Sequence, residues 1–264
     1  MDSTFLAYIL ALFIGISLGF IGAGGSILTL PILVYVAHVD KVMATAYSLF
    51  IVGFTALIGS FTYMTKRLVH YKTALIFSIP SLTTVFLVRR YLMPMLPKVI
   101  LGLDQGTFLL LFFSIFMLLA SYNMIKAKKK EDNEADIDNM TFNYPLIFVE
   151  GIVVGVLTGL VGAGGGFLII PALVSLAKLP MRLAIGTSLL IIAAKSLIGF
   201  MGESANFGTF DWSFLAIFTG MACSGIFIGT YFGKFVSSAK LKLIFGYFVL
   251  GMAMYMISKE MKWI

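Results

Sequence analysis

Hydrophobic residues fill ten long runs along this chain, and polar and charged residues gather between them. We expect helices over these runs: 5–21, 26–37, 43–65, 73–88, 106–125, 145–161, 166–177, 183–202, 212–233 and 241–258. A helix needs about 20 apolar residues to cross the ~30 Å hydrocarbon core of a bilayer. The longer runs meet this length, whereas 26–37 and 166–177 are too short to cross alone. The pattern predicts an all-α integral membrane protein.

The chain also repeats itself with an offset of 140 residues. The stretch from Gly15 to Gly59 aligns without a gap with Gly155 to Gly199, and 18 of its 45 paired positions are identical. Each copy contains Gly-Ala-Gly-Gly followed by a proline. Internal duplication in an apolar chain is typical of transporters. We therefore divide the chain into a first transmembrane repeat (1–126), a polar linker (127–143) and a second transmembrane repeat (144–264).

Each repeat holds five of the runs, and its short second run either crosses the membrane or enters and returns. Both options give an odd number of crossings, so the second repeat starts on the side opposite the first. The sequence thus predicts two inverted five-segment repeats, with glycine-broken or re-entrant helices that meet near the midplane.

The distribution of basic residues predicts how the chain is oriented in the membrane. Twelve lysines and arginines fall on the side of the linker and six on the other. By the positive-inside rule the linker is cytoplasmic and both termini lie outside. The net charge of +7 comes from these run ends, so it does not indicate a nucleic-acid-binding protein. The single cysteine, Cys223, excludes an internal disulfide.

The glycine-rich turns carry candidate chemistry. Lipid cannot hydrogen-bond to a free backbone, so an unwound segment must be buried in protein or line a cavity. The next helix begins near Ser26 or Gly166 with unpaired N–H groups and the positive end of its dipole, which favours an anion. The alternative is that these glycines only allow helices to pack closely.

Lys195 is the only basic residue well inside a long apolar run, and it shares a helical face with Ser188. A charged lysine inside the membrane is energetically costly. Three environments would fit this one: a substrate anion, an ion pair with Glu150 or Glu203, or a side chain that extends to the membrane surface. The first repeat has no acidic residue inside a run, which favours an anion over a cation. Glu150 and Glu203 could relay protons or simply lie at the interface.

These considerations define an expected binding site for a small anion, without catalytic residues, metal or cofactor. Its members are Gly22, Ala23, Gly24, Gly25, Ser26, Ser48, Gly162, Ala163, Gly164, Gly165, Gly166, Thr187, Ser188 and Lys195. The glycine motif lacks the Gly-Lys-Ser/Thr of a phosphate-binding loop, so ATP is not expected as the energy source. The sequence leaves open whether the protein forms a homo-oligomer.

The two glycine motifs, with Pro31 and Pro171 behind them, resemble the TauE/SafE sulfite exporter family. The segments 44–49 and 184–189 resemble the family's second recurring block, and the likeness covers nearly the whole chain. The resemblance implies transport of sulfite or small organosulfonates across the prokaryotic cytoplasmic (inner) membrane, usually outward. Tyr47 stands where the second copy has Thr187, so the two half-sites are chemically unequal.

Our leading hypothesis is a multi-pass secondary transporter that exports a small sulfur-containing anion, driven by the membrane potential or a proton gradient. The alternative is an anion channel that uses the same glycine turns without alternating access. An intramembrane enzyme has no convergent cluster of histidine, cysteine or carboxylate side chains in its favour.

Overall fold

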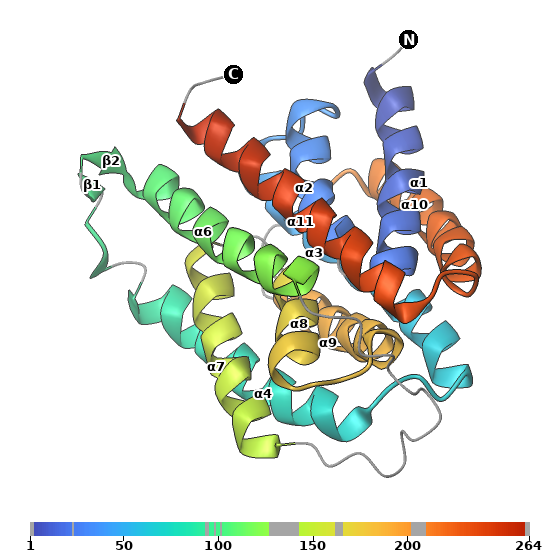
Figure 1. The fold of residues 1–264 in the computed structure, drawn as a ribbon. Helices are drawn as coiled ribbons and strands as arrows, with labels where there is room; N and C mark the ends of the chain where they lie inside the picture. Colours follow the sequence, from blue (N-terminus) through green and yellow to red (C-terminus); the bar gives the residue numbers. More distant parts are fainter. Residues whose placement is uncertain are drawn as a thin grey trace.

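The computed structural model describes residues 3–22, 24–92, 95–97, 99–100, 102–126, 143–161, 166–201 and 210–261. These residues form a bundle of helices with one small sheet (Figure 1). The first repeat contains α1 (Ser3–Ile21), α2 (Gly24–Tyr35), α3 (Lys41–Thr65), α4 (Tyr71–Leu87), the π-helix η1 (Val88–Leu92), β1 (Val99–Ile100), β2 (Leu103–Asp104) and α6 (Gln105–Lys126). The second contains α7 (Tyr144–Val161), α8 (Gly166–Pro171), the π-helix η3 (Ala172–Leu176), α9 (Met181–Met201), α10 (Trp212–Gly233) and α11 (Ser238–Glu260).

The predicted runs and the observed helices agree to within a few residues. The departure from an all-helical chain is the two-residue hairpin of β1 and β2, in which Val99 pairs with Asp104. Four described segments are long and apolar enough to cross a membrane: Ala46–Thr65, Tyr71–Leu92, Met181–Met201 and Trp212–Gly233. Of these, the span in α9 is the most deeply buried inside the protein.

The second segment of each repeat is short, as the sequence predicts. The helix α2 has 12 residues, while α8 has 6 and continues into the five-residue π-helix η3. With a rise of ~1.5 Å per residue, α2 covers about 18 Å, well below the ~30 Å of a hydrocarbon core. It packs back against α1, so the first two segments form a helical hairpin around the glycine turn.

The two repeats interlock rather than lying side by side. The most extensive helix contacts are those of α1 with α10, α4 with α7, α3 with α9, and α6 with α11 (Figure 1). Each pair joins one helix from each repeat, and exchanging the repeats leaves the pattern unchanged. A two-fold relation between the halves produces this kind of pairing.

The connection after the second segment has the same backbone in both repeats. His38 has φ 55°, and its equivalent, Lys178, has φ 60°. In each repeat the N–H group of the next residue, Val39 or Leu179, donates to the carbonyl six positions earlier at 2.9 Å. The duplication is therefore present in the backbone as well as in the sequence.

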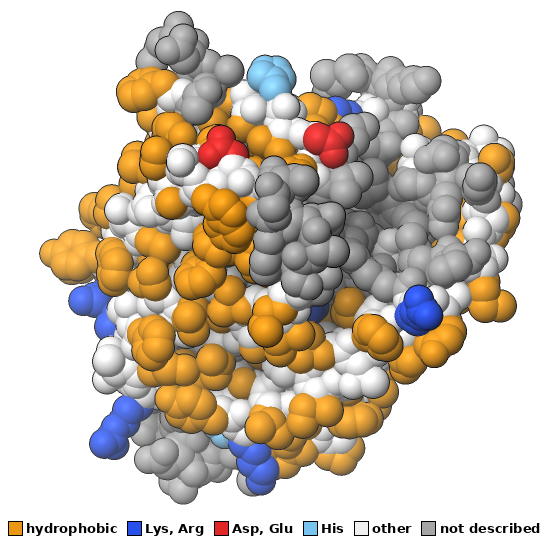
Figure 2. Space-filling view, turned by 180° about the vertical axis from the view of Figure 1, so that it is seen from behind, with side chains coloured by type: hydrophobic (Ala, Val, Ile, Leu, Met, Phe, Trp, Pro, Cys, Tyr) orange, Lys and Arg blue, Asp and Glu red, His pale blue; other side chains and the backbone are white. Residues whose placement is uncertain are grey.

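The surface between the ends of the bundle is apolar. Many bulky side chains of the long helices are exposed, including Phe61, Phe86 and Phe227 at 58%, 66% and 55%. In Figure 2 hydrophobic side chains cover much of the visible face, with the acidic side chains near one end. So large an apolar surface fits a lipid environment.

Candidate functional site

The first glycine turn lies between α1 and α2. Gly22 adopts φ +89° and donates its N–H group to the Leu18 carbonyl at 2.7 Å, which closes the end of α1. A Cβ atom built on Gly22 would lie 2.9 Å from Ile185 Cγ2 of α9. Backbone conformation and lack of space therefore both require glycine here. Ala23 lies outside the described residues, and Gly24 and Gly25 open α2.

The second glycine turn is described only at its end. Gly162, Ala163, Gly164 and Gly165 lie outside the described residues, and α8 begins at Gly166. A Cβ atom built on Gly166 would lie 2.9 Å from the Ser26 hydroxyl oxygen. The first turns of α2 and α8 thus meet across the interface between the repeats. The N-terminal end of a helix carries partial positive charge and N–H groups without intrahelical partners.

Lys195 lies beside this meeting point. Its side chain is 7% exposed, and its Nζ atom donates to Thr158 Oγ1 at 3.4 Å. Thr158 stands in the last turn of α7, just before the second glycine turn. Ile192, one turn before Lys195, packs against Gly166. The lysine is therefore bonded to the end of α7, one turn of α9 away from the residue that contacts the start of α8.

The environment of Lys195 narrows the alternatives left by the sequence. Because the side chain is buried, it does not extend to the membrane surface. Among the described residues, both carboxylate oxygens of Glu150 lack a hydrogen-bond partner, so Lys195 is not bonded to Glu150. Glu203 lies outside the described residues. The structure therefore excludes two of the alternatives and leaves pairing of Lys195 with Glu203 or with a substrate anion.

The predicted hydroxyl ligands make contacts of their own. Ser188 Oγ donates to the Ile185 carbonyl at 2.8 Å within α9. Thr187 Oγ1 accepts the N–H group of His70 at 3.0 Å, at the start of α4. Ser48 is half-buried on α3. The hydroxyls of Thr187 and Ser188 thus bond to the backbone, whereas the Ser26 hydroxyl lies next to the start of α8.

Thr187 and its equivalent in the first repeat, Tyr47, each accept a backbone hydrogen bond from a residue that caps a helix. Tyr47 Oη accepts the N–H group of Asp211 at 2.6 Å, just before α10. Asp211 caps α10 through its side chain, as His70 caps α4. Tyr47 and Thr187 therefore each bond to the capping residue of the fourth segment in the other repeat.

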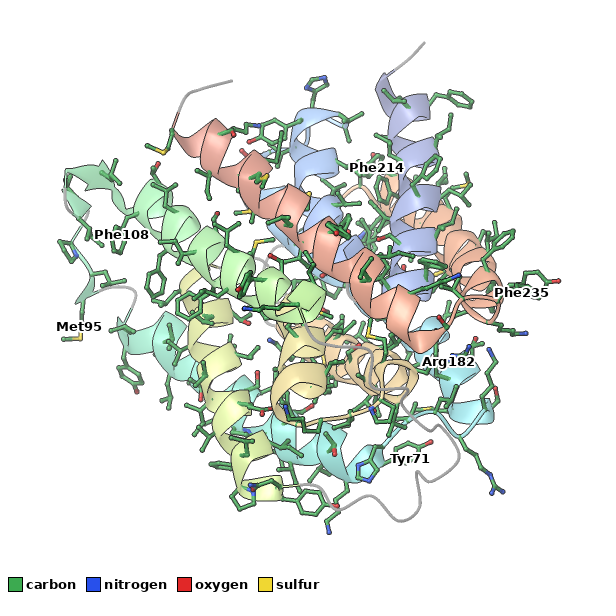
Figure 3. The ribbon with its side chains drawn as sticks, in the orientation of Figure 1. Tyr71, Met95, Phe108, Arg182, Phe214 and Phe235 are labelled. Atoms are coloured by element: carbon green, nitrogen blue, oxygen red, sulfur yellow. The ribbon has the colours of Figure 1, made fainter. Side chains whose placement is uncertain are left out.

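A cavity of about 380 Å³ lies beside the Tyr47 contact. It is lined by Tyr8, Ala37, Val39, Tyr47, Asp211, Ser213, Phe214 and Ile217. Figure 3 shows Phe214 toward the end of the molecule where α1 begins and α11 ends, whereas Arg182 and Tyr71 lie toward the other end. None of the predicted site residues that the structure describes lines this cavity.

Sequence reasoning missed Thr158 and Tyr63. The Tyr63 hydroxyl donates to the Gly19 carbonyl at 3.2 Å and so satisfies a backbone acceptor near the end of α1. Thr158 directly precedes the second motif, where the first copy has Leu18. That polar difference between otherwise similar copies was a usable signal for Thr158. Nothing in the local sequence marked Tyr63.

Comparison with known proteins gives consistent results. The sequence model of the family described as sulfite exporter TauE/SafE matches residues 7–256. A "probable membrane transporter protein" of Xylella fastidiosa strain 9a5c is 29% identical, over 92% of this chain and 91% of its own length. The probable membrane transporter protein YunE of Bacillus subtilis is 30% identical, over 77% of this chain and 79% of its own.

Proposed function

Because this chain belongs to the TauE/SafE sulfite exporter family, we propose that it is a secondary transporter that moves a small sulfur-containing anion out of the cytoplasm. The family and the relatives named as membrane transporters make it a multi-pass membrane transporter. Sulfite or an organosulfonate as substrate, the cytoplasmic membrane as location and an outside position of both termini are parts of the proposal.

The observation that carries the proposal is the meeting of α2 and α8 at Ser26 and Gly166, with Lys195 buried beside it. Two helix N-termini and one lysine are a suitable environment for a sulfonate or sulfite group. The remaining expected contacts are backbone N–H groups of Gly24, Gly25 and the turn 162–165. Hydroxyls and N–H groups bind an anion more weakly than several arginines would, and a carrier must release its substrate.

The membrane potential supplies a driving force in the proposed direction. A negative cell interior favours outward movement of an anion by ~2.3 kcal/mol per charge per 100 mV. No hydrolysis of ATP is needed for export down this gradient.

Counterflow in proteoliposomes tests the proposal and separates it from a channel. Purified protein is reconstituted, and sulfite, thiosulfate, taurine and sulfoacetate are compared as substrates. A carrier shows saturable flux that is stimulated by unlabelled substrate on the opposite side, because its site must return through the membrane. Flux without trans-stimulation would support the channel instead, and no flux of any of these solutes would remove the proposed substrate class.

We expect Lys195→Met to raise the apparent KM for sulfite at least tenfold, because the substitution removes a buried charge next to the site. Lys234→Met, at an exposed position, is the matched control for loss of one lysine and should keep the wild-type value. Membrane insertion is checked by yield and size-exclusion behaviour. Unchanged kinetics in Lys195→Met would exclude the lysine from the site and leave the helix termini alone.

A further inference from the structure

Glu150 is a buried acid that the proposed anion site does not use. It lies on α7, seven residues from the beginning of that helix, and its side chain is 3% exposed. Both carboxylate oxygens are buried and have no hydrogen-bond partner among the described residues. Its equivalent in the first repeat is Leu10, so the acid is specific to the second repeat.

The surroundings of Glu150 contain little to compensate a negative charge. The next residue, Gly151, packs against the backbone of Phe77 in α4, and the Ser81 hydroxyl of the same helix is also buried without a partner. Apart from the buried Lys195, which contacts Thr158 near the end of α7, the described titratable and charged side chains on the elements around α7 are exposed: Tyr71, Lys72, Arg90, Tyr91, Tyr122, Lys126 and Lys178. Tyr144, on α7 itself, is half-buried. His70, at the start of α4, is half-buried and bonded to Thr73.

Of these groups Lys178 is near enough to act on Glu150 electrostatically, but it does not hydrogen-bond to the carboxylate. An ionised carboxylate buried without a partner is strongly unfavourable. Glu150 can therefore lose its proton only when its carboxylate becomes exposed to water or gains a new partner.

Glu150 is also placed to sense the anion site. Glu150 and Thr158 are eight residues apart, so they share one face of α7 and are separated by ~12 Å along its axis. Thr158 is the hydroxyl that Lys195 contacts. An anion bound at Lys195 offsets the positive charge of the lysine and so favours the neutral form of Glu150.

We propose that Glu150 is a proton-binding site coupled to the anion site, so that one proton moves together with each substrate anion. This inference rests on the proposed transport function. The carboxyl group takes its proton from water on the side from which the anion enters and returns it to water on the side of release. For a doubly charged anion, one net negative charge remains, and the membrane potential still drives it outward.

The expected coupling between proton binding at Glu150 and anion binding can be calculated from the distance between the charges. Two unit charges ~12 Å apart at an effective dielectric constant of ~20 alter each other's binding by about tenfold. Because binding linkage is reciprocal, the anion changes the proton affinity of Glu150 by the same factor. Glu150→Gln mimics the neutral acid, so this variant should bind sulfite as tightly as the wild type with protonated Glu150. Its sulfite affinity should also no longer change over the pH range in which Glu150 titrates.

The test follows proton movement during sulfite flux in proteoliposomes that contain a pH-sensitive dye. Sulfite itself binds protons near neutral pH, so the difference between wild type and Glu150→Gln is the quantity measured. We expect this variant to retain sulfite counterflow and lose the proton that moves with sulfite. Ser81→Ala removes a different unpartnered polar group from the neighbouring helix and should behave as wild type. Equal proton movement in wild type and Glu150→Gln would overturn the proposal and leave the transporter intact.

A further measurement and a second variant keep the outcomes distinct. Infrared difference spectra of wild type and Glu150→Gln at neutral pH should show a protonated carboxyl band in the wild type alone, and its absence overturns the proton site for any substrate. If Glu150→Gln does not fold, Glu150→Leu takes its place, because leucine occupies the equivalent position in the first repeat. Absence of all sulfite flux in the wild type, with the carboxyl band present, would refute sulfite export rather than proton binding.

Discussion

Single residues break the symmetry between the repeats, and they do so close to the proposed site. Lys195 and Thr158 contact each other in the second repeat. Their equivalents in the first are Thr55 and Leu18, neither of which carries a charge. Thr55 Oγ1 lies 3.9 Å from Cys223 Sγ instead. The pair of a charged side chain and a hydroxyl is thus present in the second repeat and not at the equivalent positions of the first.

His70 provides a prediction at the same scale. Its Nδ1 atom accepts the N–H group of Thr73 at 3.1 Å and so caps α4. Burial and, after it, the charge of Lys72 lower the pKa of His70 below its usual 6.5. Protonation would turn this acceptor into a donor, so the unfolded state binds the proton more readily. Stability is therefore full above pH 6.5 and falls as the pH drops from there toward the lowered pKa.

We expect the melting temperature of the detergent-solubilised protein to fall below pH 6.5 in the wild type and to fall less in His70→Asn. Asparagine is a good N-cap that does not titrate, so it preserves the contact and removes the proton dependence. A decline of the same size in both proteins would show that His70 does not contribute to acid sensitivity.

At the scale of helices, glycines determine how closely the repeats approach. A Cβ atom on Gly15 of α1 would coincide with the Ala222 carbonyl of α10. Its equivalent, Gly155 of α7, would place a Cβ atom 2.7 Å from the Ser81 carbonyl of α4. Close helix packing therefore explains these two glycines, whereas positive φ and a turn explain Gly22.

Gly15→Ala should destabilise the protein by about 1–3 kcal/mol, because the two helix backbones must move apart to admit the methyl group. Gly220→Ala lies on α10, where an added Cβ atom meets nothing within 4 Å, so it is the matched control. That change should be neutral or stabilising by at most about 1 kcal/mol, since alanine favours helix. Thermal unfolding in detergent compares them, and equal melting temperatures would contradict the close packing of α1 on α10.

The sequence was sufficient to predict helices because each has its own apolar run, and to predict the short second segments because the runs of α2 and α8 are short. It was not sufficient to predict which helices pair. The contact of Gly15 with Ala222 joins positions far apart in the chain, and no local pattern encodes it. The same limit applies to the bond between the Thr187 hydroxyl and the backbone of His70, which joins residues 117 positions apart.

For the whole molecule, the central prediction is that the two repeats have opposite orientations in the membrane. Interchange of the repeats preserves the pairing of α1 with α10 and of α4 with α7. Tyr47 and Thr187 likewise hold the caps of α10 and α4 in the opposite repeat. A two-fold axis in the membrane plane would place these two caps on opposite sides of the bilayer.

Cysteines at His38 and Lys178 test this prediction with matched sites. The two residues are equivalent, exposed and alike in backbone conformation, so their intrinsic reactivity as cysteines should be similar. With Cys223 replaced by alanine, we expect an impermeant maleimide to label His38→Cys in intact cells and Lys178→Cys only after the membrane is opened. Labelling of both sites from outside would mean that the repeats are parallel. Labelling of Lys178→Cys alone would keep the inversion but place the termini in the cytoplasm, against the orientation that the basic residues predict.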